Sequence, residues 1–310
     1  ANETSRTITL HPFDESVDEI AALVTEVVDL ASELDIELDA ETAERCVQHL
    51  LYVNQVNQVM NLTRIKDIHD ALVLHIVDSL ALYRDLPVEP EHFLDMGTGA
   101  GFPGIPFALY TGCSGVLLDS VGKKIDAVNA FIDALGIEDV EGIHDRCESY
   151  AMKMRGRFDT VFARAVGQMS MIIEYGTPFL EDDGYLVVAK ANPEAPELKL
   201  AEKTAAICGL ELIGCDEFDL PRGLGHRSVF LYQKVSEPQI KLPRAVGLAK
   251  KQPLAHRVLL ILLTLFYDRM FHVKRPVVFY TDSAISNKAA VIELQVGIQA
   301  LHALVIGFLF

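Results

Sequence analysis

Residues 93–106 read FLDMGTGAGFPGIP, and they constrain the fold of this chain more than any other stretch. Apolar residues and an acid lead into glycines at three alternate positions, Gly97, Gly99 and Gly101. This pattern predicts a short buried strand that ends in a tight turn, followed by the start of a helix. Glycine allows backbone angles that other residues avoid and lets the main chain approach a ligand closely. The unpaired N–H groups at a helix start favour a ligand at the same place.

The residues around the glycines indicate which ligand this is. The next expected strand, residues 115–119, ends in Asp119, about 20 residues after the glycines, where an acid accepts hydrogen bonds from ribose hydroxyls. The dinucleotide fingerprint needs a glycine where this chain has Phe102, which disfavours NAD and FAD. Asp95 would repel a pyrophosphate but suits a ligand that carries positive charge. These features favour S-adenosylmethionine, which has a sulfonium, an ammonium and a ribose but no phosphate.

From residue 91 onward, apolar runs typical of strands alternate with segments typical of helices. The alternation predicts an α/β fold of the Rossmann-like kind, with an open, seven-stranded, mostly parallel sheet covered by helices on both faces. The last two strands, near 211–217 and 227–234, are separated by a turn, so we expect an antiparallel hairpin. Ligands bind beyond the carboxyl ends of strands in such sheets. The polar residues expected at those ends are Asp95, Asp119, Asp145, Arg164 and Lys190.

Residues 1–88 are predicted to form an acidic helical region ahead of the domain at 89–257. In a helix over about 40–60, helical spacing places Asn54, Asn57 and Asn61 on one face. That face is either a polar helix surface or a carboxamide face that lines a substrate cleft. In a third helix, near 68–83, the same spacing brings His75, Asp78 and Ser79 together. They form either a local pair that fixes packing or a group next to the site.

Several separated stretches resemble one family. LDMGTGAGFPGIP is similar to the signature of the RsmG (GidB) family, and the resemblance extends in order over roughly residues 15–257. It implies a class I, S-adenosylmethionine-dependent methyltransferase that modifies N7 of a guanine in the 16S rRNA of the small ribosomal subunit. The further matching stretches are Asn61-Leu62-Thr63, His75-Ile76-Val77-Asp78-Ser79, Leu117-Leu118-Asp119-Ser120 with Lys123-Lys124, and Ala163-Arg164-Ala165.

The residues and the resemblance together assign candidate roles. Cys147 and Glu148 follow the third strand of the sheet; the resemblance implies that they contact the cofactor, and the alternative is a helix-capping loop. Arg164 is expected to position the reactants, with His75 and Asp78 beside it. The full cofactor set is Asp95, Gly97, Gly99, Phe102, Asp119, Cys147, Glu148 and Arg164. The expected RNA contacts are Asn61, Lys190, Arg222, Arg227, Lys250 and Lys251.

Two absences in the sequence bear on the atom that is methylated. Arg164 stands where amino-methyltransferases carry Asn or Asp followed by Pro-Pro, which disfavours an exocyclic amine as the target. The sequence has no Pro-Cys pair, which disfavours the covalent route to a pyrimidine carbon. A ring nitrogen or an oxygen remains. A methyltransferase of a small molecule and a non-catalytic nucleotide-binding assembly factor stay open as alternatives.

The formal charge of −17 is unusual for a protein that contacts RNA, but the charge is unevenly distributed. Residues 1–60 hold thirteen acidic residues and two arginines, a net charge of −11. Residues 219–258 hold eight basic and two acidic residues, a net charge of +6. Because RNA binding depends on Lys and Arg contacts to phosphates, we expect the basic stretch at 222–257 to face RNA.

The remaining features concern compartment and partners. Five scattered cysteines without C-x-x-C spacing disfavour a disulfide framework and a zinc site, and they fit a cytoplasmic protein without metal. No secretory leader is recognisable at the start of the sequence. Residues 258–310 are predicted to be an apolar tail that is dispensable for folding, and its run VLLILLTLFY is too short to span a bilayer. We therefore expect no stable membrane association, and a monomer is favoured.

Overall fold

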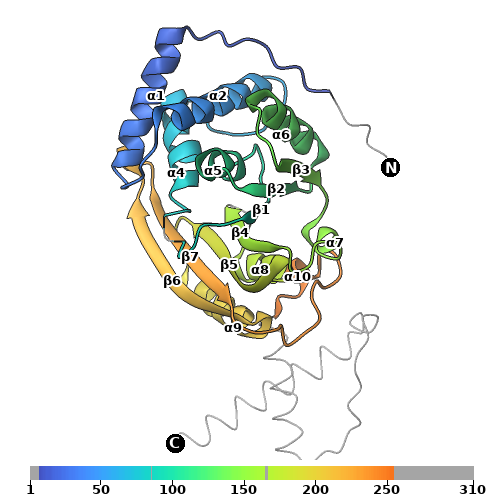
Figure 1. The fold of residues 1–310 in the computed structure, drawn as a ribbon. Helices are drawn as coiled ribbons and strands as arrows, with labels where there is room; N and C mark the ends of the chain where they lie inside the picture. Colours follow the sequence, from blue (N-terminus) through green and yellow to red (C-terminus); the bar gives the residue numbers. More distant parts are fainter. Residues whose placement is uncertain (1–6, 85, 165–166, 255–310) are drawn as a thin grey trace, which may run out of the picture. The chain divides into compact units, whose positions relative to one another are not determined.

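The computed structural model describes residues 7–84, 86–164 and 167–254, so the expected tail and Ala165 lie outside the described residues. The chain divides into two compact units, residues 1–259 and 260–310, and all described residues belong to the first. This unit contains a seven-stranded sheet with helices on both faces (Figure 1). Its strands are β1 (His92–Met96), β2 (Ser114–Asp119), β3 (Val140–His144), β4 (Phe158–Arg164), β5 (Leu180–Lys190), β6 (Leu210–Asp219) and β7 (His226–Lys234).

The sheet has the strand order β3-β2-β1-β4-β5-β7-β6. Strands β1 to β5 pair in parallel, whereas β7 is antiparallel to both β5 and β6. This confirms the predicted mostly parallel sheet with an antiparallel last strand. The chain order reverses between β1 and β4, and in open α/β sheets the ligand crevice lies at such a switch point.

Alternate residues of each strand face opposite layers, because successive side chains of a strand point to opposite faces. Leu117 of β2 packs in the first layer with Phe131, whereas Val116 and Leu118 pack in the second with Ile172. The helices of the first layer include α1 (Val17–Ser32), α2 (Ala40–Asn57), α5 (Gly104–Thr111) and α6 (Gly122–Leu135). Those of the second are α7 (Cys147–Tyr150), α8 (Met169–Gly176) and α9 (Ala195–Cys208), with the short α10 (Leu248–Lys251) against α8.

The N-terminal helices are part of this core. Val27, Leu50 and Ile76 are fully buried in the same cluster as Phe93 and Phe162 of the sheet. The predicted N-terminal helical extension is therefore confirmed, and it packs directly on the sheet that carries the glycine turn.

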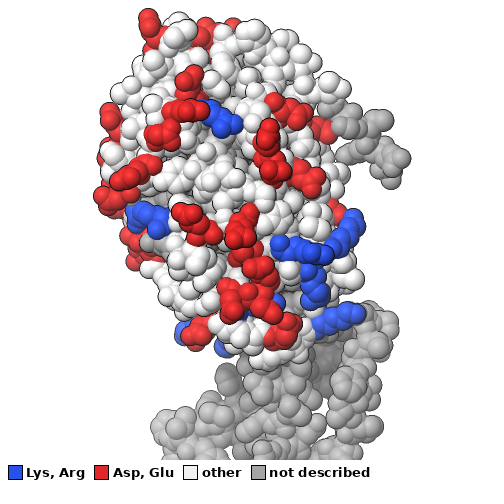
Figure 2. Space-filling view, viewed as in Figure 1, with Lys and Arg blue, Asp and Glu red and all other residues white. Residues whose placement is uncertain are grey.

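On the face seen in Figure 2, acidic side chains are widespread, whereas several basic ones gather where Figure 1 places α7 and α10.

The helix expected near 68–83 is divided by a π-helical segment. It consists of α3 (Ile68–Ala71), the π-helical residues Leu72–Val77, and α4 (Asp78–Leu80). The N–H of Asp78 donates to the carbonyl of Val73, five residues earlier. Such wider turns rotate side chains away from the i, i+3, i+4 spacing and are frequent at functional sites.

Candidate active site

The glycine turn follows β1 and is held against the end of β2. The N–H groups of Gly97 and Thr98 donate to the carbonyl of Leu118 at 2.8 and 3.0 Å. Gly99 has φ +63°, and a Cβ built on it would meet only the carbonyl oxygen of Gly97, at 4.0 Å. The backbone at Gly99 therefore leaves open space where a ligand can come close.

Asp119 connects the end of β2 to this turn. One carboxylate oxygen, Oδ2, accepts a hydrogen bond from the N–H of Gly99 at 3.0 Å, and Oδ1 accepts one from the N–H of Val121 at 2.9 Å. Lys124 Nζ lies 4.0 Å from Oδ2. An ionised carboxylate can accept about four hydrogen bonds, so Asp119 keeps acceptor capacity for ligand hydroxyls beside Gly99.

Asp95 lies beneath the turn and is fully buried. Its Oδ2 accepts a hydrogen bond from the N–H of Gly104 at 2.9 Å, where α5 begins. A Cβ at Gly104 would lie 2.8 Å from that oxygen, so this close approach requires glycine. Burial raises the pKa of Asp95 to about 6. The Thr98 hydroxyl, the N–H of Gly104 and the charge of Arg164 each lower the pKa and so limit this rise. Its Oδ1 has no hydrogen bond of acceptable geometry to any described residue.

Cys147 and Glu148 open α7, directly after β3. Glu148 is buried, and its Oε1 accepts a hydrogen bond from the N–H of Gly247 at 2.7 Å. Burial, reinforced by the charge of Glu148, raises the pKa of Cys147 to about 12. Cys147 is therefore a neutral thiol at physiological pH, which fits a packing or ligand-contact role better than a nucleophilic one.

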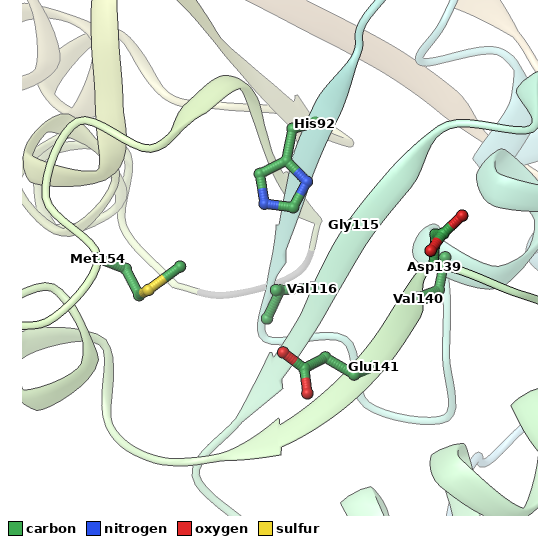
Figure 3. Close-up of a pocket in the computed structure, with 7 residues that line it drawn as sticks. All are labelled: His92, Gly115, Val116, Asp139, Val140, Glu141 and Met154. Atoms are coloured by element: carbon green, nitrogen blue, oxygen red, sulfur yellow. The ribbon is translucent and has the colours of Figure 1, made fainter.

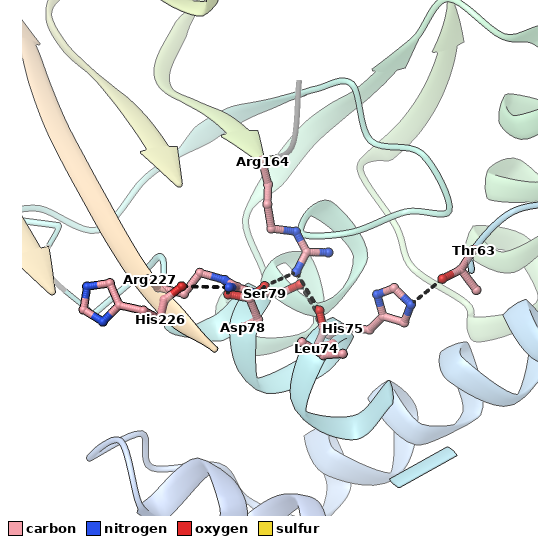
Figure 4. Close-up of polar contacts among 8 residues, drawn as sticks. All are labelled: Thr63, Leu74, His75, Asp78, Ser79, Arg164, His226 and Arg227. Carbon is pink, nitrogen blue, oxygen red and sulfur yellow. Dashed lines mark hydrogen bonds and ion pairs between the residues drawn. The ribbon is translucent and has the colours of Figure 1, made fainter. Parts of the chain in front are cut away.

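His75, Phe102 and Arg164 form a stacked group beside the turn; Figure 4 shows His75 and Arg164 of this group. The His75 and Phe102 rings are nearly parallel, with centroids 4.4 Å apart, and Arg164 Cζ lies 5.9 Å from the Phe102 centroid. His75 Nε2 lies 2.9 Å from the hydroxyl of Thr63. Burial, with the charge of Arg164 adding to it, lowers the pKa of His75 to about 3. The imidazole is therefore neutral at physiological pH.

Asp78 holds two arginines (Figure 4). Its Oδ2 accepts from Arg164 Nη1 at 3.0 Å and from Arg227 Nη2 at 3.1 Å, and its Oδ1 accepts from Arg227 Nε at 2.8 Å. The same Nη1 of Arg164 also donates to the carbonyl of Leu74 at 3.0 Å. Asp78 is buried, so this carboxylate fixes Arg164 at the end of β4 and joins β4, β7 and the N-terminal helices.

This geometry belongs to a sequence that is similar to known proteins. Residues 42–221 match the family GidB, described as rRNA small subunit methyltransferase G. The chain belongs to this family. A ribosomal RNA small subunit methyltransferase G from Desulfitobacterium hafniense is 33% identical over 224 residues, which cover 71% of this chain and 93% of the relative. One from Lactococcus lactis subsp. lactis is 32% identical over 234 residues, covering 74% and 98%.

In this member of the methyltransferase G family, three of the basic residues expected to contact RNA are engaged within the protein. Lys190 Nζ lies 2.8 Å from both the Glu197 carboxylate and the carbonyl of Gly167. Arg222 pairs with Glu26, and Arg227 pairs with Asp78 as described above. Lys250 and Lys251 are exposed on α10, and Asn61 is exposed after α2.

The asparagines of α2 do not act alike in this family member. Asn57 accepts hydrogen bonds from the N–H groups of Leu62 and Thr63 at 2.8 and 3.0 Å, and it donates to the carbonyl of Thr63 at 3.0 Å. Asn57 thus shapes the loop that presents Thr63 to His75. Asn54 is half-buried.

His49 of α2 is a site residue that the sequence reasoning missed. It is fully buried, its Nε2 lies 3.0 Å from the carbonyl of Ala100, and its ring lies 4.4 Å from that of Phe102. The signal was its spacing, because His49 lies three residues after Cys46 and four before Val53, both buried. Burial lowers its pKa to about 3, so it supports the glycine turn as a neutral ring.

A surface pocket lies at the other end of the strands from the glycine turn (Figure 3). Its lining includes His92, Gly115 and Val140, which stand at the amino ends of β1, β2 and β3. Within the described ranges, no three His, Cys, Asp or Glu side chains gather as a metal site would require. Among the residues that the structure describes, no helix is both long enough and apolar enough to cross a bilayer.

Proposed function

We propose that this chain uses S-adenosylmethionine to methylate N7 of a guanine in the 16S rRNA of the small ribosomal subunit. The observation that carries the proposal is the direct link between Asp119 and the glycine turn, in a chain whose sequence belongs to the methyltransferase G family. We also propose that it acts as a cytoplasmic monomer.

The residues at the turn fit the proposed methyl donor. Gly99 leaves the backbone open, and Asp119 keeps acceptor capacity for ribose hydroxyls. Asp95 contributes a buried carboxylate close to the turn, whose negative charge favours a cationic ligand over a phosphate. S-adenosylmethionine, when bound, supplies an electrophilic methyl group on a sulfonium.

The side chains of the site suit a reaction that needs no proton transfer. Guanine N7 has an in-plane lone pair and no proton, so the enzyme's task is positioning and electrostatics. His75 and His49 are neutral, and Cys147 is a thiol, so none of the three carries a charge at physiological pH. The Arg164–Asp78 pair places a fixed cation beside Phe102.

A single-turnover assay with labelled methyl donor tests the proposal. Small ribosomal subunits isolated without the modification should accept label from the wild-type chain, and the Gly99→Val variant should transfer none. Donor binding without transfer to RNA would instead support a non-catalytic binding factor. Label found only on a small molecule would support the other alternative and contradict the RNA substrate.

A further inference from the structure

An RNA substrate needs cations that are free to meet phosphates, and three of the expected ones already have carboxylate partners. Lys190, Arg222 and Arg227 each form an ion pair within the protein. The pair of Arg227 with Asp78 is almost fully buried, with side-chain exposures of 16% and 3%. A phosphate would have to compete with Asp78 for Arg227, so the main RNA-binding surface must include other residues.

The connection from α7 to β4 carries basic side chains that had no role in the sequence reasoning. Residues 146–157 contain four basic residues and a single acid, Glu148, which is buried. Arg146 and Lys153 are exposed, whereas Arg155 lines a surface pocket together with Glu181, Asp182 and Glu237. The pair of Lys153 with Asp145 leaves the lysine side chain 71% exposed, and pairs this exposed contribute little to stability.

The segment that carries α10 is fixed beside this connection. Gly247, the residue before α10, donates its N–H to Glu148 of α7 at 2.7 Å. Arg244 makes two bonds of 2.6 Å to Glu174 of α8, and both side chains are at least 94% buried, at 6% and 3% exposure. These ties hold the exposed Lys250 and Lys251 next to α7, and residues 238–254 contain no acid.

Arg146 lies next to the proposed cofactor site. The N–H of Asp145 donates to the carbonyl of Asp119 at 3.3 Å, and Arg146 follows directly in the chain. In Figure 2 the basic side chains gather over α7 and α10, on a face that is otherwise largely acidic or uncharged. A polyanion attracted to this face would meet positive charge at the edge of the reaction site.

We propose that this α7–α10 basic surface, formed by Arg146, Lys153, Lys250 and Lys251, binds the phosphodiester backbone of the RNA substrate. The inference rests on the proposed function, because it assumes that the substrate is RNA. Phosphate contacts position a nucleic acid without reading its bases, so this surface orients the RNA while the stacked group at His75, Phe102 and Arg164 lies nearer the target base. Glu148 then serves as a positioning residue, since it ties the proposed cofactor site to α10.

The salt dependence of RNA binding tests the proposal. The double variants Arg146→Gln/Lys153→Gln and Lys250→Gln/Lys251→Gln each remove two cations of the surface. The matched control, Lys199→Gln/Lys203→Gln, removes two exposed lysines of α9. Each lost phosphate contact on single-stranded RNA lowers the slope of log K against log salt by about 0.7, so each double variant should lose about 1.4. Donor affinity should stay unchanged in all three.

The possible outcomes test the proposed RNA-binding surface and the proposed function separately. If the surface variants keep the wild-type slope, as the control should, the α7–α10 basic surface is not the RNA contact. If the wild-type chain binds small-subunit RNA but transfers no methyl group to it, the proposed function is wrong, and the slopes still decide where RNA binds.

Discussion

At the scale of single residues, we expect cofactor binding to depend first on Asp119, which joins the glycine turn to the end of β2. Replacing Asp119 with Ala removes the acceptor for Gly99 and the proposed partner of the ribose. A lost hydrogen bond to a charged group costs about 1.5–3 kcal/mol, or roughly ten- to hundredfold in affinity. Calorimetry should show this loss of donor affinity in Asp119→Ala but not in Asp133→Ala, an exposed acid of α6. Equal donor affinities in the two variants would show that Asp119 does not contact the donor.

Gly99 provides a second test, matched by Gly112 at the end of α5. Both glycines have positive φ, +63° and +71°, and a Cβ would find no neighbour closer than 4.0 Å at either. Valine should therefore strain both backbones by about 1–2 kcal/mol. Only Gly99→Val places a branched side chain where the ligand is expected, so it alone should abolish donor binding. Donor binding that survives in Gly99→Val would show that the pocket is elsewhere.

The buried histidines make stability depend on pH. His49 has its pKa lowered to about 3 in the folded state, so it stabilises the fold above its unfolded pKa of about 6.5 and loses that contribution as the pH falls. Asp95, whose pKa is raised to about 6, has the opposite effect: it stabilises the fold at low pH, and this stabilisation is lost as the pH rises through 6. The combined effect of His49 and His75 is larger than that of Asp95, so the free energy of unfolding should fall from pH 7 to pH 5.

Denaturant titrations at the two pH values isolate His49. The variant His49→Gln should recover about 2 kcal/mol of the loss between pH 7 and pH 5, because a glutamine binds no proton when the chain unfolds. The control His11→Gln, at an exposed position, should keep the wild-type dependence. A wild-type dependence in His49→Gln would mean that the pKa of this ring is the same in the folded and unfolded states.

At the scale of elements, the π-helical segment shows what the sequence predicts and what it does not. The spacing of His75, Asp78 and Ser79 placed them on one α-helical face. In the structure His75 contacts Thr63 and Phe102, whereas Asp78 contacts Arg164 and Arg227. Those arginines lie 86 and 149 residues away in sequence. A local pattern cannot predict such partners, because they depend on how the sheet brings β4 and β7 to one edge.

The Asp78 network gives the prediction at this scale. Asp78→Asn removes a buried charge that two arginines share, and breaking a buried pair in this way costs about 3–5 kcal/mol. The control Asp219→Asn, at a side chain 85% exposed, should stay within about 0.5 kcal/mol of the wild type. Urea unfolding measures both. Equal stability of the two variants would show that the network contributes little to joining the helices to the sheet.

At the scale of the whole molecule, the strands, the antiparallel hairpin and the glycine turn could be predicted because each depends on a local pattern. Helix α8 ends at Gly176, because the 3₁₀ turn Thr177–Phe179 follows with Pro178 in it. The ion-pair partners of the basic residues could not be predicted in this way. The basic stretch at 222–257 is visible in the sequence, but the partners of Arg222, Arg227 and Arg244 lie on α1, α4 and α8.

The most direct test of the central claim is chemical mapping of the methylated base. N7-methylation puts a positive charge on guanine and weakens its glycosidic bond, so borohydride reduction followed by aniline cuts the RNA there. Small-subunit RNA treated with the wild-type chain and S-adenosylmethionine should be cut at one guanine, and RNA treated with Gly99→Val should stay intact. Recovery of N6-methyladenine or a ribose methyl group, with no aniline-sensitive guanine, would contradict the proposed reaction.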